Sequence, residues 1–150
     1  MDIPLSPPPL PIMVVEDDPM DLYLLHRVLT AHELAHELHV IGKSDDVSDA
    51  VHRLAQQEDR RLPIILLLDL RLPRGEGIEI LRQVKALPQA AAVRVVIVTG
   101  SHNPAGRRAT LALGADAYFV KPLHLEEFMQ LGALIKEVAW GLTPREPSRL

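Results

Sequence analysis

The sequence predicts an α/β protein, a doubly wound five-stranded parallel sheet with five helices divided between its two faces. Five short apolar runs alternate with longer segments of helical periodicity, the pattern of consecutive strand–helix units. Most of these runs are continuously apolar, which is typical of strands covered on both faces. Right-handed crossovers then place helices on both sides of the sheet. The strands are predicted at residues 12–15, 38–41, 64–68, 93–98 and 117–120.

The segments between these runs carry apolar residues at helical spacing. Asp18, Pro19 and Asp21 supply an N-cap, a proline at the first helical position and an acid in the first turn, so the first helix is predicted to begin there. The fourth helix is predicted at residues 105–113, with mostly alanine on its apolar side. The apolar positions of the other helices are Leu22, Leu25 and Leu29; Val47, Ala50, Val51 and Leu54; Leu81, Val84 and Leu87; and Phe128, Leu131, Ile135 and Val138.

Composition and charge exclude several classes of protein. The 150 residues include no cysteine, which excludes a disulfide scaffold, a thiolate metal site and a cysteine nucleophile. A net charge of −4 argues against a nucleic-acid binder with a basic face. No apolar run approaches the ~20 residues of a membrane span, and the proline-rich N-terminus lacks the features of a signal peptide. We therefore expect a cytoplasmic protein with a flexible lead-in (1–11), one domain (12–142) and a C-terminal tail (143–150).

Polar residues follow the predicted strands at the edge where open α/β sheets bind ligands. The first strand runs into Glu16 and Asp17, the third into Asp69, the fourth into Thr99 and the fifth into Lys121. Carboxylates gathered at one edge repel one another unless a cation is present, and oxygen ligands suit Mg²⁺. Asp69 could attack phosphorus to form an aspartyl phosphate, while Lys121 and the Thr99 hydroxyl stabilise the oxygens of the transferred group. The sequence thus indicates a magnesium-dependent phosphorylation site.

Four segments of the chain resemble response-regulator receiver domains. The match covers about residues 12–140 and has the acidic pair, the acceptor aspartate, the threonine and the Lys-Pro step in the order of the family. The resemblance implies a flavodoxin-like strand order, 2-1-3-4-5, with the first and third strands at the centre of the sheet. The segments are VVEDDP (14–19), LLDLRLP (67–73), VTG (98–100) and YFVKP (118–122).

The resemblance implies a set of metal ligands, residue by residue. Glu16 and Asp17 are similar to the acidic pair of the family, with Asp17 as a direct Mg²⁺ ligand, and Asp69 is similar to the phospho-acceptor. The backbone carbonyl of Arg71 would be the third protein ligand. Two positions depart from the common pattern. Glu16 stands where aspartate is commoner, and Arg71 stands where a neutral or acidic side chain is common and could pair with the phosphoryl group or shield it from water.

The resemblance also implies switch and loop-shaping residues. Thr99 is similar to the switch hydroxyl, Tyr118 to the switch aromatic that turns inward on phosphorylation, and Lys121 to the lysine that neutralises the phosphoryl group. The bond between Lys121 and Pro122 is expected to be cis. The residues expected to shape the loops around the acceptor are Pro73, Gly77, Gly100 and Pro122.

The function implied is that of a stand-alone two-component response regulator, a signalling switch with no enzymatic activity beyond self-phosphotransfer and autodephosphorylation. A sensor histidine kinase would phosphorylate Asp69 with Mg²⁺, and the regulator would act through phosphorylation-dependent protein–protein interaction, without nucleic acid or membrane partners. The stretches 69–74 and 128–143 resemble the small regulators paired with phytochrome-type histidine kinases. That resemblance implies a homodimer through the fourth helix, fifth strand and fifth helix, between about residues 104 and 142.

Two alternatives stay open at this point, and a third pattern is weighed beside them. The chain could be a phosphate-independent interaction module with the same fold, or a relay or sink for phosphate. Residues 32–36 also form a His-Glu-x-x-His pattern, which binds zinc when it lies on a helix. Here the pattern falls at the end of the first predicted helix, and His39 is too close along the chain to be the usual third ligand, so no zinc site is predicted.

Overall fold

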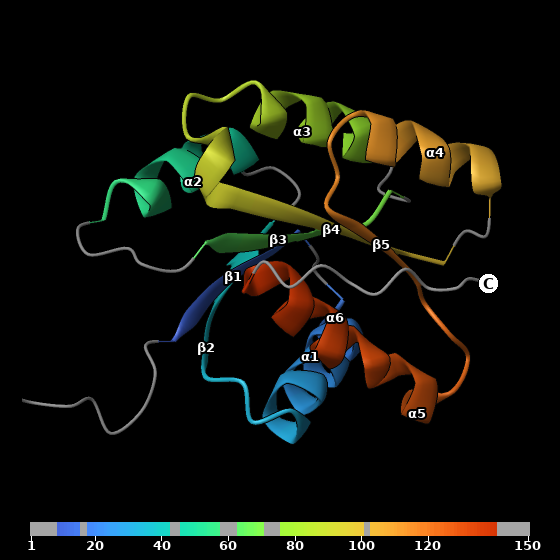
Figure 1. The fold of residues 1–150 in the computed structure, drawn as a ribbon. Coiled ribbons are helices and arrows are strands. Elements are labelled where there is room, and N and C mark those ends of the chain that lie inside the picture. Colours follow the sequence, from blue (N-terminus) through green and yellow to red (C-terminus); the bar gives the residue numbers. More distant parts are fainter. Residues whose placement is uncertain are drawn as a thin grey trace, which may run out of the picture.

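A computed structural model describes residues 9–15, 18–42, 46–57, 63–70, 76–100 and 103–140. It contains one five-stranded parallel sheet in the order β2-β1-β3-β4-β5 (Figure 1), as predicted. The strands are β1 (Leu10–Val15), β2 (His36–Ile41), β3 (Ile64–Leu68), β4 (Val93–Thr99) and β5 (Ala117–Val120). The first and third strands therefore lie side by side near the centre of the sheet.

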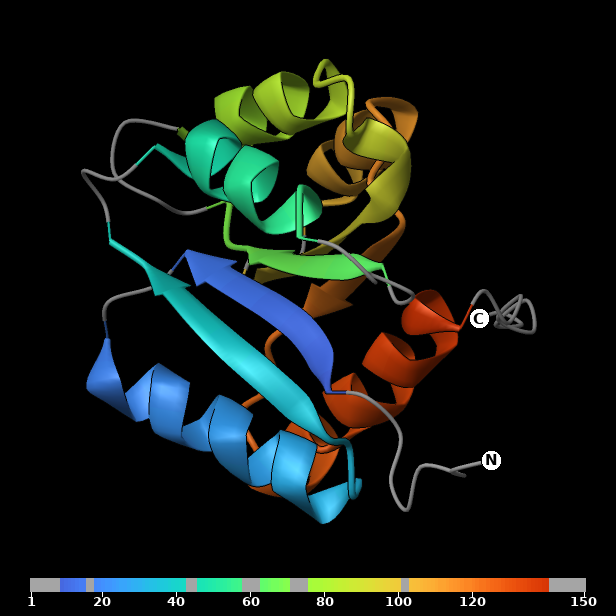
Figure 2. The ribbon, with the colours of Figure 1, turned by 90° about the vertical axis from the view of Figure 1, so that its left-hand side faces the viewer.

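Helices cover both faces of the sheet. Figures 1 and 2 show α1, α5 and α6 on one face and α2, α3 and α4 on the other. The predicted last helix is divided into α5 and α6, with Met129 between them. No helix in the described ranges is long and apolar enough to cross a membrane. The helices are α1 (Pro19–Ala31), α2 (Val47–Ala55), α3 (Glu76–Lys85), α4 (Pro104–Ala112), α5 (Leu125–Phe128) and α6 (Gln130–Ala139), with a short 3-10 helix, η2 (Ala90–Ala92), before β4.

The two faces of β3 explain its continuous apolar sequence. Ile65 and Leu67 pack into the core beneath α1 and α6, while Leu66 and Leu68 pack into the core beneath α2 and α3. All four are at most 3% exposed. Burying a side chain of this size contributes about 1.5–3 kcal/mol to stability, so every position of a central strand favours an apolar residue.

The start of β1 differs from the prediction. The strand begins at Leu10, two residues earlier than expected, and it includes Pro11. Pro11 has no N–H to donate, but at this position β1 pairs with β2 alone, because pairing with β3 begins at Ile12. Pro11 therefore lies at a position where the other side of β1 is not yet paired with a strand.

The start of α1 agrees with the prediction. Asp18 is the N-cap, its Oδ1 accepts a hydrogen bond from the Met20 N–H at 2.9 Å, and Pro19 is the first helical residue. Asp21 lies in the first turn. Because β1 leads into this helix, the first turn of α1 lies at the carboxyl end of the sheet.

Candidate functional site

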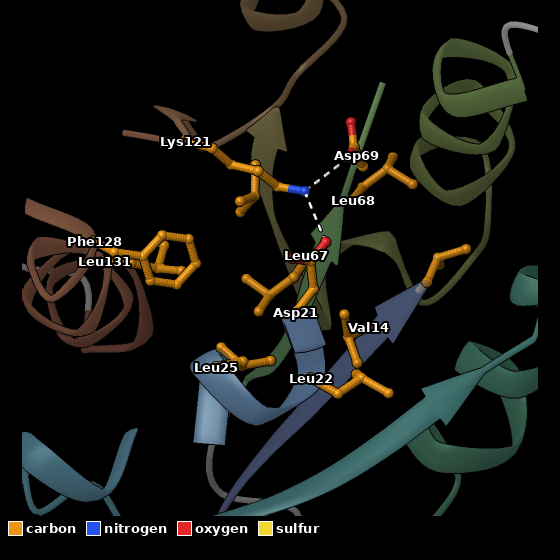
Figure 3. A pocket seen from close by; sticks show the side chains of 12 residues that line it. Val14, Asp21, Leu22, Leu25, Leu67, Leu68, Asp69, Lys121, Phe128 and Leu131 are labelled. Atoms are coloured by element: carbon orange, nitrogen blue, oxygen red, sulfur yellow. Dashed lines mark hydrogen bonds and ion pairs between the residues drawn. The ribbon is translucent and has the colours of Figure 1, made fainter. Parts of the chain in front are cut away.

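Three of the predicted site residues meet where the strands end. Asp69 directly follows β3, Thr99 is the last residue of β4, and Lys121 directly follows β5. The Lys121 ammonium donates to Asp69 Oδ2 at 3.0 Å (Figure 3). The Lys121 backbone N–H donates to the Thr99 carbonyl at 2.7 Å, which joins the ends of β4 and β5. Parallel strands thus bring together residues that lie far apart in the sequence.

The pair of Asp69 and Lys121 is partly withdrawn from water. Their side chains are 17% and 26% exposed, and Thr99 beside them is fully buried. A charge in such a place is stable only when an opposite charge or a hydrogen-bond donor faces it. Lys121 is therefore a cation that balances the Asp69 carboxylate.

Several predicted site residues lie outside the described residues: Glu16, Asp17, Arg71 and Pro73. Of the predicted metal ligands, Asp69 alone can be placed, and its carboxylate is a ligand type that Mg²⁺ prefers. Within the described ranges, no three acidic or histidine side chains gather closely enough to hold a metal ion. The metal ligands predicted at Glu16, Asp17 and Arg71 therefore stay a prediction.

Sequence reasoning missed the second partner of Lys121. Asp21, in the first turn of α1, places its Oδ2 3.4 Å from the Lys121 ammonium, and Figure 3 shows the ammonium linked to both carboxylates. The sequence indicated only an acid at the helix N-terminus. A usable signal existed, because the first turn of a helix that follows β1 must lie at the same edge of the sheet as Asp69.

An apolar cavity of about 40 Å³ adjoins these charged groups (Figure 3). Asp21, Asp69 and Lys121 are its charged lining residues. Low polarity on one side of an ion pair strengthens the electrostatic interaction between its members. The remaining lining is aliphatic or aromatic: Val14, Val15, Leu22, Leu25, Leu67, Leu68, Val98, Phe128 and Leu131.

The two predicted switch residues occupy neighbouring strands but do not lie opposite each other. Thr99 pairs with Val120 in the register of β4 and β5, and Tyr118 pairs with Ile97. Tyr118 is half-buried on the side of the sheet that α4 covers, and the guanidinium carbon of Arg107 lies 5.8 Å from the centre of its ring. The aromatic ring is therefore in contact with a charged residue of α4.

The predicted loop residues have different outcomes. A Cβ at Gly77 would lie 2.8 Å from the Asp69 carbonyl oxygen, closer than real Cβ atoms approach, so α3 can pass Asp69 in this way only with glycine there. Gly100 is half-buried directly after Thr99. The expected cis bond before Pro122 is wrong, because the described residues contain no cis peptide bond. Lys121 reaches Asp69 from the trans form, which X–Pro bonds favour by about 0.5–1 kcal/mol.

The His-Glu-x-x-His pattern forms a helix end and no metal site. His32 is the C-cap of α1, and Glu33 follows with a φ of 53°. The N–H groups of Glu33 and Leu34 bond the carbonyls of Thr30 and Leu29, each at 3.0 Å, which is the Schellman motif. The pattern therefore does not lie on one helix, as zinc binding requires.

The family model for the response regulator receiver domain matches residues 12–132. A five-stranded parallel sheet in this order, with an aspartate and a lysine paired at its carboxyl edge, agrees with that match. The chain belongs to the receiver-domain family and is a two-component response regulator, the class of protein with which sensor histidine kinases interact.

The relatives include regulators of phytochrome signalling. The chain is 30% identical to the response regulator Rcp1 of Synechocystis sp. over 126 residues, covering 84% of this chain and 86% of Rcp1. The Mn²⁺-bound structure of Rcp1 has a TM-score of 0.64 at 28% identity, covering 93% of this chain and 100% of that one. The structure of the phosphorylated cyanobacterial phytochrome response regulator RcpA has a TM-score of 0.67 at 25% identity, covering 91% of this chain and 97% of that one. The structure of the bacteriophytochrome response regulator RtBRR has a TM-score of 0.62 at 31% identity, covering 93% of this chain and 85% of that one.

Proposed function

We propose that Asp69 accepts a phosphoryl group from a phytochrome-type sensor histidine kinase and that the phosphorylated protein acts by binding other proteins. The observation that carries this proposal is the 3.0 Å contact between Lys121 and Asp69 at the carboxyl edge of the sheet. It places a fixed cation beside a carboxylate that directly follows a central strand. Relatives that are a phosphorylated regulator and a Mn²⁺-bound regulator support the same assignment.

In the transfer step, an Asp69 carboxylate oxygen attacks the phosphorus of a phosphohistidine on the kinase. The phosphorus–nitrogen bond breaks, and the histidine nitrogen leaves with the bonding electron pair. Mg²⁺ held by Asp69, Glu16, Asp17 and the carbonyl of Arg71 would neutralise the phosphoryl oxygens. Lys121 supplies the second positive charge, and the Thr99 hydroxyl supplies a hydrogen bond.

The response would pass from Thr99 to Tyr118. A phosphoryl group at Asp69 attracts the Thr99 hydroxyl, and the ring of Tyr118 then turns toward the space that Thr99 leaves. Arg107 lies against that ring, so the movement would change the surface of α4. This surface is where we expect the phosphorylated form to differ from the unmodified one.

Self-association through α4, β5 and the last helix, which comprises α5 and α6, is the interaction that the exposed side chains support. Leu111 of α4 is 39% exposed, Leu125 of α5 is 46% exposed, and Leu123 between β5 and α5 is 98% exposed. These three leucines lie on or between the elements of the predicted dimer face, where they would supply apolar contacts. The net charge of −4 supports a protein partner over nucleic acid.

A titration with beryllofluoride, a phosphoryl analogue, tests this function. Wild type should bind the analogue in the presence of Mg²⁺ and lose binding when EDTA removes the metal. Asp69→Asn should not bind, whereas Asp49→Asn, which removes an exposed carboxylate of α2, should bind like wild type. If wild type fails to respond, the phosphate-independent interaction module is the better description. If it responds, the lifetime of phosphorylated Asp69 separates a switch from a relay or sink.

A further inference from the structure

We propose that Asp21 is a positioning residue that holds the Lys121 ammonium in place for the phosphoryl group on Asp69. This inference rests on the proposed phosphorylation of Asp69. It assigns a role to a side chain for which the sequence indicated only a favourable charge at the start of a helix.

The geometry places the ammonium between two carboxylates. Lys121 Nζ lies 3.0 Å from Asp69 Oδ2 and 3.4 Å from Asp21 Oδ2 (Figure 3). The Asp21 side chain is 36% exposed, so water screens this second contact only in part. An ammonium has three N–H donors, which allows it to keep both bonds at once.

Asp21 owes its position to the rigid start of α1. The cap at Asp18 and the proline at position 19 define the first turn, and Asp21 is its third residue. A carboxylate on a capped helix is a fixed anchor, whereas the four-carbon stem of a lysine is flexible. Asp21 therefore restricts the positions of the Lys121 ammonium to those near Asp69.

The second contact matters most after phosphoryl transfer. The Asp69 oxygen that now accepts from Lys121 then becomes part of a phosphorylated carboxyl group, and the ammonium has to move its hydrogen bond to a phosphoryl oxygen. Asp21 remains bonded during this exchange and keeps the ammonium at the site. Without Asp21, the lysine side chain must be ordered again when the phosphoryl group binds.

The simpler alternative is that Asp21 only stabilises the helix. Asp49 offers the matched case, because it occupies the same third position of α2 after an aspartate N-cap and also contacts a cation, Arg53, at 3.4 Å. The negative charge of either residue interacts favourably with the dipole of its helix. A helix effect should therefore appear in Asp21→Ala and Asp49→Ala alike, whereas an effect on phosphoryl binding should appear in Asp21→Ala alone.

The test measures beryllofluoride binding by calorimetry at saturating Mg²⁺. Asp21→Ala should weaken beryllofluoride binding about threefold to tenfold, the range expected for ordering one flexible side chain. Asp21→Asn, which keeps an acceptor oxygen, should lose less, and Asp49→Ala should match wild type. The affinity for Mg²⁺ alone should not change in Asp21→Ala. In a Lys121→Met background, Asp21→Ala should have no further effect, because the two residues act through the same contact.

Beryllofluoride binding by Asp21→Ala that equals or exceeds wild type would overturn the positioning role, as would a parallel loss of Mg²⁺ affinity. The outcome is separable from the proposed function. If wild type binds the analogue and Asp69→Asn does not, a normal Asp21→Ala variant overturns the positioning role alone. If wild type does not bind, both proposals are overturned.

Discussion

The ammonium of Lys121 bonds Asp69 Oδ2 at 3.0 Å across 52 positions of the sequence. The contact joins the loop after β5 to the end of β3, and the intervening strand β4 bonds the Lys121 backbone through Thr99. The lysine is thus held by its main chain on one side and by a carboxylate on the other. This arrangement leads to the first prediction.

Lys121→Met should lower the rate of phosphoryl transfer to Asp69 by about 10²-fold, the effect of removing one donor that stabilises developing negative charge. Methionine keeps the apolar stem that lines the cavity, so a lower transfer rate in this variant results from the missing positive charge. Lys85→Met is the control, because Lys85 makes a similar contact with Asp116 at 3.4 Å and has nearly the same exposure. Equal transfer rates in Lys121→Met and wild type would contradict the assignment of this lysine.

Gly77→Ala should displace the chain at Asp69. The added Cβ would meet the Asp69 carbonyl oxygen and the Leu70 Cα, both at 2.8 Å, and backbone atoms cannot move aside easily. We expect weaker beryllofluoride binding together with a loss of about 1–3 kcal/mol in stability, as for other overpacked sites. Urea denaturation and calorimetry measure the two effects. Unchanged binding in a folded variant would show that α3 is free to shift away from the acceptor.

Gly132→Ala should destabilise the contact between α1 and α6. The His32 ring occupies the space that a Cβ at Gly132 needs, and His32 Nε2 donates to the Met129 carbonyl at 2.6 Å. The expected loss is about 1–3 kcal/mol in urea denaturation. Gly106→Ala in α4 is the opposite case, because the nearest atom to a Cβ at Gly106, the Asn103 Cβ, would be 3.8 Å away. Alanine should stabilise that helix by up to about 1 kcal/mol, and similar effects of the two variants would argue against the packing described.

Glu33→Gly should stabilise the protein by about 0.5–1 kcal/mol, because Glu33 holds the left-handed position after α1 with a φ of 53°. Helix α4 ends in the same motif, but there Gly114 takes that position with a φ of 103°. Gly114→Ala should therefore cost about 1 kcal/mol. Thermal unfolding should show the opposite effects of the two variants, a gain of stability for Glu33→Gly and a loss for Gly114→Ala. A destabilised Glu33→Gly variant would mean that the glutamate side chain contributes more than its backbone costs.

Leu111→Lys should weaken self-association if α4, β5 and the last helix (α5 and α6) form the dimer face. A charge placed in an apolar contact loses its hydration and has no partner there. Met20→Lys is the control, because Met20 is 62% exposed on α1, on the opposite face of the sheet from α4. Sedimentation with Mg²⁺ and beryllofluoride measures the effect. Equal dimerisation of Leu111→Lys and wild type would place the interface elsewhere.

Much of the fold could be predicted because burial on two faces leaves a strong pattern. The run from Ile64 to Leu68 is apolar at every position, and the structure places β3 over those same residues. The meeting of Asp69, Thr99 and Lys121 follows from one rule, that parallel strands end at the same edge. Strand order came from the resemblance to a family, since the pattern of runs alone does not contain it.

Other features depend on contacts that a local pattern does not contain. Met129 interrupts the last helix where its carbonyl accepts from His32, 97 positions away. Pro11 is tolerated in β1 because pairing with β3 begins one residue later, at Ile12, which only the register shows. Asp21 matches an ordinary first-turn acid until the first turn of α1 is placed beside Lys121. Each was missed because its partner belongs to another element of the fold.

Phosphorylation of the intact protein tests the central claim most directly. Wild type and Asp69→Asn would be incubated with phosphoramidate and Mg²⁺, and the mass of each intact chain measured. We predict that wild type gains one phosphoryl group and that Asp69→Asn gains none. No gain in wild type, or an equal gain in both proteins, would contradict the assignment of Asp69 as the phospho-acceptor.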